Sequence, residues 1–162
     1  MRNKNLKVLV IGAILISTIL SLTGCGKETN KEIEKKVEVT DIKGTINNLN
    51  EDVKITGMEL GGDTYIEYVY YIKYDGNKLY TYDARTKVPI VDAQDKITPD
   101  ATEEMYEYTL TENKINELKE FIESQGKSLD GGKYIVKTDN KTYGIEDSEK
   151  FEEIIKSITE NI

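Results

Sequence analysis

A long alternating segment lies near the middle of the chain. Residues 64–74 read TYIEYVYYIKY, in which large apolar side chains recur at alternate positions, a pattern that predicts a β-strand. The even-numbered side chains are the more apolar and are expected to face the core. The turn residues Asp75-Gly76-Asn77 follow, so residues 78–82 are expected to return as the second strand of a hairpin. Whether the turn has two or three residues stays open, and with it the face that Tyr80 and Tyr82 share.

Further strands are predicted on both sides of this hairpin. Residues 53–58 form a strand before it, residues 104–110 alternate after it, and residues 133–145 form a second hairpin. Between the first hairpin and residues 104–110 lies a long connection, residues 84–103, which holds both prolines of the chain. Connections of this length within one domain are usually functional or disordered.

Two amphipathic helices complete the pattern. Thr111 is a suitable N-cap for the first helix, Gly126 is suited to end it, and Asp147 or Ser148 is suited to cap the second. Because hairpins predominate, we expect an α+β domain: a mainly antiparallel sheet of about five to six strands with both helices packed on one face. Apolar residues recur at helical spacing at Ile115, Leu118, Phe121 and Ile122, and again at Phe151, Ile154, Ile155 and Ile158.

The N-terminal residues have a different character. Three basic residues within the first seven positions precede residues 8–22, which carry no charge. A basic start followed by an apolar stretch of this length is typical of a secretory signal peptide. As a helix this stretch spans about 22 Å, less than the roughly 30 Å hydrocarbon core of a bilayer. A permanent transmembrane helix, lengthened by flanking residues, is the alternative.

The apolar stretch ends in Leu22-Thr23-Gly24-Cys25. These residues resemble the lipobox of bacterial lipoproteins, in which an aliphatic residue and two small residues precede the cysteine that is lipidated. The resemblance covers residues 1–25 and implies a diacylglyceryl group on the Cys25 sulfur, with or without an N-linked acyl chain, and cleavage before Cys25. It implies no cofactor besides this covalent lipid, and two acyl chains give stable membrane anchoring. The composition is rich in Lys, Asn, Ile and Glu, which suits a Gram-positive source. With such a source, the resemblance implies a location on the outer face of the cytoplasmic membrane.

The expected organisation is a signal peptide (residues 1–24), a lipidated and charged tether (residues 25–39) and one globular domain (residues 40–162). The tether is dense in Lys and Glu, so it buries too little apolar surface to offset the entropy of ordering it. Residues 1–24 hold three of the 22 basic residues and none of the 30 acids. The formal charge of −8 therefore becomes −11 once they are removed.

Composition excludes several kinds of active site. The chain has no His and one Cys, which excludes His-dependent nucleophile pairs, His-ligated zinc and Cys-rich metal sites. The acidic balance argues against nucleic acid as a partner. Carboxylates remain, at Glu103-Glu104, Asp92/Asp95 and Asp147/Glu149, but none of these pairs lies in a recognisable motif. We therefore expect no catalytic residue, no metal site and no enzyme, with a small carboxylate-dependent hydrolase of envelope polymers as the alternative.

Tyrosine is unusually frequent. The chain has eleven, and seven of them lie within residues 65–82. A strand with large rings on both faces can cover a core with one face and bind a partner with the other, although the high β-propensity of tyrosine is a simpler explanation. The candidate binding surface comprises Tyr65, Tyr71, Tyr80 and Tyr82.

These features predict a membrane-anchored extracytoplasmic lipoprotein that catalyses no reaction and acts by binding or within an envelope or membrane assembly. The expected partner is a protein or peptide, and the charge of −11 favours a cationic one. A purely structural surface lipoprotein is the other alternative. The sequence leaves the oligomeric state open.

Overall fold

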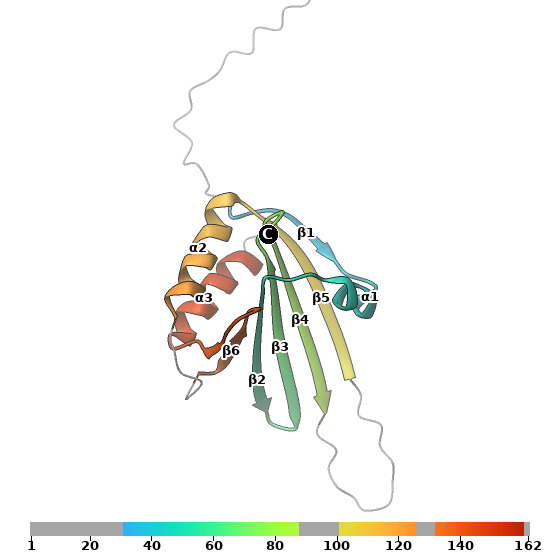
Figure 1. The fold of residues 1–162 in the computed structure, drawn as a ribbon. Coiled ribbons are helices and arrows are strands. Elements are labelled where there is room, and N and C mark those ends of the chain that lie inside the picture. Colours follow the sequence, from blue (N-terminus) through green and yellow to red (C-terminus); the bar gives the residue numbers. More distant parts are fainter. Residues whose placement is uncertain (1–30, 88–100, 126–131, 161–162) are drawn as a thin grey trace, which may run out of the picture.

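The computed structural model describes residues 31–87, 101–125 and 132–160 (Figure 1). These residues form three helices and one seven-stranded sheet, in the order β1-β5-β4-β3-β2-β6-β7. All neighbouring strands are antiparallel, which confirms the expected α+β class and the mainly antiparallel sheet. The elements in chain order are β1 (Ile33–Glu38), α1 (Ile42–Asn48), β2 (Val53–Gly61), β3 (Thr64–Lys73), β4 (Lys78–Lys87), β5 (Ala101–Leu110), α2 (Glu112–Ser124), β6 (Tyr134–Lys137), β7 (Thr142–Gly144) and α3 (Ser148–Thr159).

Strands β2 to β5 form a meander in which each strand pairs with the next along the chain. Lys73 of β3 pairs with Lys78 of β4, so four residues form the turn, one or two more than expected. Gly76 in this turn has a φ of 82°, which glycine adopts without steric cost. The register pairs Tyr71 with Tyr80 and so decides which face the tyrosines of β4 share.

Helices α2 and α3 pack on one face of the sheet (Figure 1). Phe151 of α3 is fully buried, and its ring centroid lies 5.3 Å from that of Tyr70 and 4.9 Å from that of Tyr134, both edge-to-face. Such ring pairs contribute about 0.5–1.5 kcal/mol beyond the area they bury. Gly57 of β2 leaves room for this packing, since a Cβ there would overlap the Tyr134 ring. The even-numbered side chains of β3 contribute to this core, as expected.

Both of these helices begin at N-caps. The Thr111 hydroxyl accepts a hydrogen bond from the backbone N–H of Lys114 at 3.3 Å, and the Asp147 carboxylate accepts one from that of Lys150 at 3.0 Å. Thr111 is therefore confirmed as the first cap, and Asp147 rather than Ser148 is the second. Gly126, expected to end the first helix, lies outside the described residues.

The opposite face of the sheet carries a second, smaller core that the sequence pattern did not predict. Helix α1 lies over it, capped at its start by the side chain of Asp41. This helix has seven residues and contributes no fully buried side chain. Val69, Tyr71, Tyr80 and Met105 are buried beneath it, with Ile42, Ile46 and Leu49 packed against them.

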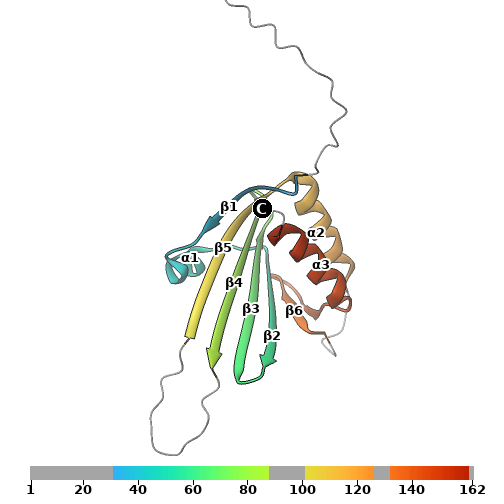
Figure 2. The ribbon, with the colours of Figure 1, turned by 180° about the vertical axis from the view of Figure 1, so that it is seen from behind.

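The helices leave one end of the sheet uncovered (Figures 1 and 2). They gather with β1 at the end where the chain enters at residue 31, whereas the meander continues past them to the β2–β3 turn. The strand pairing has the same asymmetry: β1 pairs with β5 only from Tyr106 onward, and β6 pairs with β2 only up to Gly57. We call the part that extends beyond, residues 58–68, 82–87 and 101–104, the distal end.

Several boundaries differ from expectation. Residues 33–38, placed in the tether, form β1: Ile33 is buried opposite Leu110, but the other five residues are exposed on the sheet edge, so a charged composition concealed the strand. The connection placed at residues 84–103 is shorter, because β4 runs to Lys87 and β5 starts at Ala101. The expected totals of five to six strands and two helices were accordingly too low.

Candidate functional site at the uncovered end of the sheet

The four tyrosines of the candidate surface lie on one face of the sheet, the face that also carries α1. Tyr71 and Tyr80 are only 5% and 9% exposed beneath this helix, so neither ring is available to a partner. Tyr82 is half-buried, and Tyr65, further along β3, is exposed. The surface that a partner can reach is therefore narrower than the four rings and lies toward the distal end.

The buried ring of Tyr80 has a polar partner within the fold. Burial, together with the adjacent Glu107 carboxylate, raises the pKa of Tyr80 to about 12. Glu107 in turn accepts a hydrogen bond from the Lys78 ammonium at 2.6 Å, which lowers the pKa of Glu107 although burial acts in the opposite direction. The polar tip of Tyr80 is thus part of an internal network rather than a contact site.

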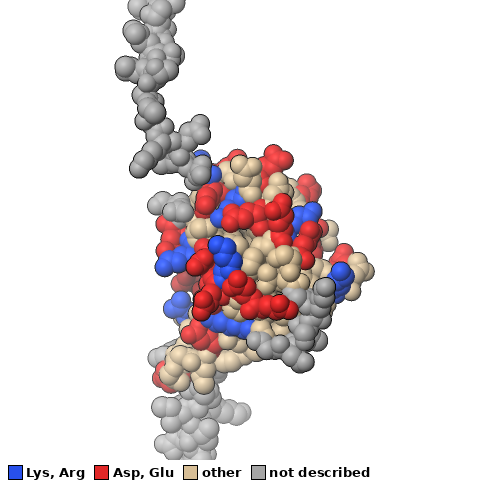
Figure 3. Space-filling view, turned by 90° about the vertical axis from the view of Figure 1, so that its left-hand side faces the viewer, with Lys and Arg blue, Asp and Glu red and all other residues tan. Residues whose placement is uncertain are grey.

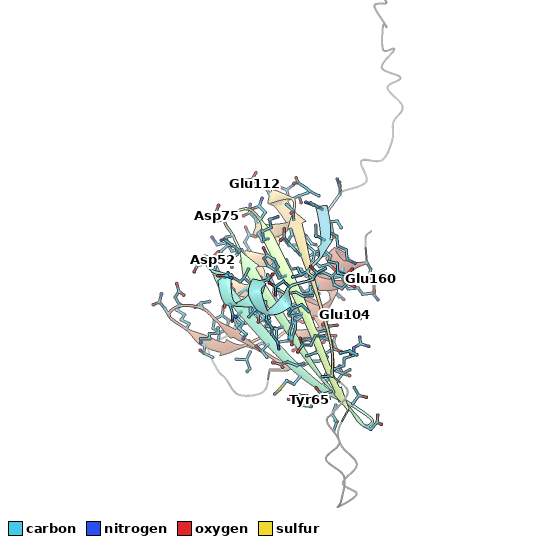
Figure 4. The ribbon with its side chains drawn as sticks, turned by 90° about the vertical axis from the view of Figure 1, so that its right-hand side faces the viewer. Asp52, Tyr65, Asp75, Glu104, Glu112 and Glu160 are labelled. Carbon is cyan, nitrogen blue, oxygen red and sulfur yellow. The ribbon has the colours of Figure 1, made fainter. Side chains whose placement is uncertain are left out.

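Exposed apolar side chains gather on the same face at the distal end. Met58, Leu60 and Tyr65 are 58%, 65% and 39% exposed, and all three lie on the β2–β3 hairpin, where Leu60 pairs with Tyr65. The Tyr65 hydroxyl donates to the Met58 sulfur, so the three side chains form one surface. Figure 4 shows Tyr65 beyond α1, toward the end of the sheet. Exposed apolar surface bordered by polar residues is typical of interaction sites.

Carboxylates border this apolar surface. Glu67 pairs with Met58 on one side and Ala84 on the other, and Glu103 follows in the same cross-strand row. Burial raises the pKa of Tyr82, and the charges of Glu103 and Glu67 raise it further, so both carboxylates lie near its hydroxyl. The described rows on this face, from Tyr82 to the β2–β3 turn, contain no Lys or Arg. We call this set the distal patch: Met58, Leu60, Tyr65, Glu67, Tyr82 and Glu103.

The other face of the distal end is polar. A cross-strand row there contains Tyr68, Asp83 and Glu104. Burial raises the pKa of Asp83, and Glu104 contributes in the same direction, whereas Arg85 opposes both. The Arg85 guanidinium is 4.0 Å from the Asp83 carboxylate. Like charges directly opposite each other destabilise a sheet, so this row is electrostatically unfavourable without a further cation.

The side that carries α2 and α3 has a different charge pattern. Acidic and basic side chains are interspersed over it (Figure 3), and several are paired directly. The Lys133 ammonium, for example, lies 2.7 Å from the Glu152 carboxylate and 3.7 Å from that of Glu59. Because its charges compensate one another, this side offers a partner less electrostatic attraction than the distal patch does.

The carboxylate pairs considered for catalysis do not converge. Glu103 and Glu104 are successive residues of β5 and point to opposite faces. Asp147 caps α3 and Glu149 lies in its first turn, where negative charge stabilises the helix. Asp92 and Asp95 lie outside the described residues. The facing carboxylates are instead Asp83 and Glu104, which only the β4–β5 register brings together.

Two hollows in the described part of the chain lie away from the distal patch. A hollow of about 860 Å³ lies along β7 and the end of α2, and one of about 440 Å³ lies beside the start of β2; neither includes a residue of the distal patch. Within the described ranges, no three His, Cys, Asp or Glu side chains are grouped so as to hold a metal ion. The same ranges contain no helix with the length and apolar character needed to cross a membrane.

Sequence reasoning found Tyr65 and Tyr82 but missed Met58 and Leu60. Their signal is the alternation Met58-Glu59-Leu60, which continues the pattern of the strand predicted at residues 53–58 as far as Gly61. Cys25, the expected lipidation site, lies outside the described residues. Comparison of the chain with protein-family models, with curated proteins and with solved structures found no match in any of the three, so the distal patch is interpreted from its own geometry and chemistry.

Proposed function

We propose that the protein is a lipid-anchored extracytoplasmic lipoprotein that catalyses no reaction and captures a cationic, amphipathic polypeptide at the distal patch. The observation that carries the binding proposal is the exposure of Met58, Leu60 and Tyr65 on a part of the sheet that no described helix covers. The anchor proposal rests on Leu22-Thr23-Gly24-Cys25 and the apolar stretch before it.

The distal patch combines two sources of binding energy. Covering exposed apolar area stabilises a complex by roughly 25 cal/mol per Å² before the cost of association. Glu67 and Glu103 supply negative charge beside that area, and the chain as a whole carries −8. Complementary charge accelerates encounter and selects among partners. A polypeptide with apolar residues on one side and Lys or Arg beside them matches both features.

The position of the patch suits a tethered binder. The chain enters the domain at residue 31, at the end of the sheet opposite the β2–β3 turn (Figure 1). The ten residues of β3 separate these ends by about 30 Å. With a lipid on Cys25, the distal patch would extend away from the bilayer toward partners in the surrounding envelope.

Peptide binding tests the patch. The full chain in detergent micelles is titrated with a fluorescent amphipathic Lys/Leu peptide and with a matched Glu/Leu peptide. We expect the Lys/Leu peptide to bind more tightly, and the double substitution Met58→Ser with Leu60→Ser to weaken its binding about tenfold. Val37→Ser is the matched control, since Val37 is 38% exposed but lies on β1, away from the distal end. Equal affinity of the double variant and the wild type would contradict the proposal.

Metabolic labelling tests the anchor. Cells that express the wild-type chain or Cys25→Ser are grown with a radiolabelled fatty acid, and the immunoprecipitated protein is examined. Label on the wild type alone is the expected result. Equal label on both would show that Cys25 is not the attachment point.

A carboxylate-dependent hydrolase of envelope polymers is a second candidate, because Asp83 and Glu104 face each other and the pKa of Asp83 is raised. A carboxyl with a raised pKa suits a general acid. Release of soluble fragments from purified cell wall, lost in Glu104→Gln with the fold intact, would favour this candidate. No release by the wild type would reject it.

A further inference from the structure

We infer that an extended basic segment of the partner adds as a strand to the outer edge of β5 at Ala101–Glu104. This inference rests on the proposed function, because it describes how the same cationic partner is held. It adds a main-chain mode of recognition to the side-chain contacts of the distal patch.

Within the described part of the chain, four residues at the outer edge of β5 have no paired strand. β1 covers β5 only from Tyr106 onward, and beyond β1 the Val39 N–H donates to the Met105 carbonyl at 2.9 Å. The backbone groups of Met105 therefore point outward, and by the alternation of a strand so do those of Glu103 and Ala101. Among the described residues, no strand pairs with these outward groups. Figures 1 and 2 agree that the distal half of β5 has no neighbouring element on its outer side.

Ala101–Glu104 lack the lysine, proline and bulges that block free edges, and their two glutamates repel an acidic strand but not a basic one. Natural sheets block free edges with proline, lysine, bulges or covering elements. Ala101, Thr102, Glu103 and Glu104 include no proline and no lysine, and the β4–β5 register runs through them without a bulge. All four are exposed. Such an edge offers an extended polypeptide a ready row of hydrogen-bonding groups.

The side chains along this edge specify a basic occupant. Glu103 belongs to the distal patch on one face, and Glu104 lies opposite Asp83 on the other. A strand that carries Lys or Arg at two successive positions would place one cation on each face. One would meet Glu103, and the other would meet the Asp83–Glu104 row, where the Arg85 guanidinium lies 4.0 Å from the Asp83 carboxylate.

The same charges argue against a second copy of this chain as the occupant. Pairing β5 with β5 of another copy would bring two pairs of Glu103 and Glu104 side by side, and like charges opposite each other are unfavourable. The net charge of −8 adds to this repulsion. A basic segment of a different polypeptide has neither penalty.

A backbone-modified peptide provides the direct test. The probe is a fluorescent peptide of sequence Thr-Val-Lys-Lys-Val-Thr. It is compared with two N-methylated versions, one methylated at the odd-numbered and one at the even-numbered amides. A further version carries Glu-Glu in place of Lys-Lys. The full wild-type chain in detergent micelles should bind the unmodified probe. N-methylation of the alternate amides whose N–H groups point toward β5 should weaken binding about tenfold. Equal affinity for all methylated and unmethylated probes would overturn strand addition. Because only the wild-type chain is used, this result does not depend on how a variant folds.

Substitutions at Glu103 provide the second arm. Glu103→Pro removes both the carboxylate and an outward N–H, at a position where sheets tolerate proline, whereas Glu103→Gln removes the charge alone. We expect Glu103→Pro to weaken probe binding more than Glu103→Gln does, with circular dichroism unchanged. Equal effects of the two would overturn the inference, as would sedimentation showing that Glu103→Pro abolishes a dimer of the wild-type chain.

The two proposals fail in distinguishable ways. In one outcome, the double substitution Met58→Ser with Leu60→Ser weakens binding of the Lys/Leu peptide, while neither N-methylation nor Glu103→Pro changes binding of the Thr-Val-Lys-Lys-Val-Thr probe. In that case the distal patch is supported as the binding site and strand addition is wrong. If none of these changes matters, both are wrong.

Discussion

Among single residues, Asp83 is expected to make the stability of the fold depend on pH. Its carboxyl is partly buried on β4 opposite Glu104, and burial raises its pKa above the ordinary value of 3.8. An acid with a raised pKa in the folded state holds its proton more tightly when the chain is folded. Its contribution therefore favours folding at low pH and is lost as the pH rises from 3.8 through the raised value.

We predict that Asp83→Asn removes this pH-dependent loss. Urea denaturation of both proteins at a series of pH values gives the difference in their free energies of unfolding. That difference should shift in favour of the variant as the pH rises through 3.8 into the raised range. Glu107 and Glu152 have lowered pKa values, so they make the free energy of unfolding increase with pH. They do so equally in both proteins. A difference that is constant with pH would contradict the assignment.

Residue-level reasoning from the sequence located the tyrosines but not their exposure. Tyr65 and Tyr71 have the same parity on β3, yet one is 39% and the other 5% exposed. The difference arises because α1 covers only the end of the sheet nearer the chain entry. No local pattern encodes where a short helix ends relative to a strand packed beneath it.

Among the elements, those with a strong local signal were predicted and those held by tertiary contacts were not. Alternation predicted β3, and cap residues predicted the starts of α2 and α3. In contrast, β1 has one buried residue, Ile33, and becomes a strand only because β5 offers it an edge. Helix α1 likewise owes its place to the second core, which exists only once the β2–β5 register has formed.

We predict that α1 opens independently of the rest of the fold. It has seven residues and no fully buried side chain, whereas α3 buries four. Short helices are marginal on their own, and segments with little buried surface open at low free-energy cost. Hydrogen exchange followed by NMR should show amides of α1 exchanging at least about tenfold faster than those of α3.

The substitution Ile46→Ala sharpens this measurement. Ile46 packs against the second core, so its truncation should lower the protection of α1 and leave α3 unchanged. Equal protection of the two helices in the wild type, or a parallel loss in both after the substitution, would show that α1 is part of the global folding unit.

At the scale of the whole molecule, the fold separates chain entry from the distal patch. The β3–β4 turn with Asp75 lies at the entry end, and Gly62 lies in the β2–β3 turn at the other. The four-stranded meander that connects them is continuous, so the two ends keep a fixed separation.

This separation predicts an orientation on membranes. A fluorophore is placed on Asp75→Cys or on Gly62→Cys of the lipid-anchored protein, and vesicles carry a quencher on their headgroups. We expect stronger quenching at position 75 than at position 62, because the entry end is closer to the anchor. Equal quenching would mean that the domain lies flat on the bilayer.

The pairing of β1 with β5 has a mechanical consequence. β1 runs from the chain entry toward the distal end, and its ladder to β5 extends from Ile33 opposite Leu110 to Glu38 opposite Tyr106. A pull between the N-terminal segment and a partner held at the distal end acts along these strands. The β1–β5 hydrogen bonds then bear the force together, in shear, instead of opening one after another like a zipper. The first strand of the domain is thus placed to resist tension applied through the segment that precedes it.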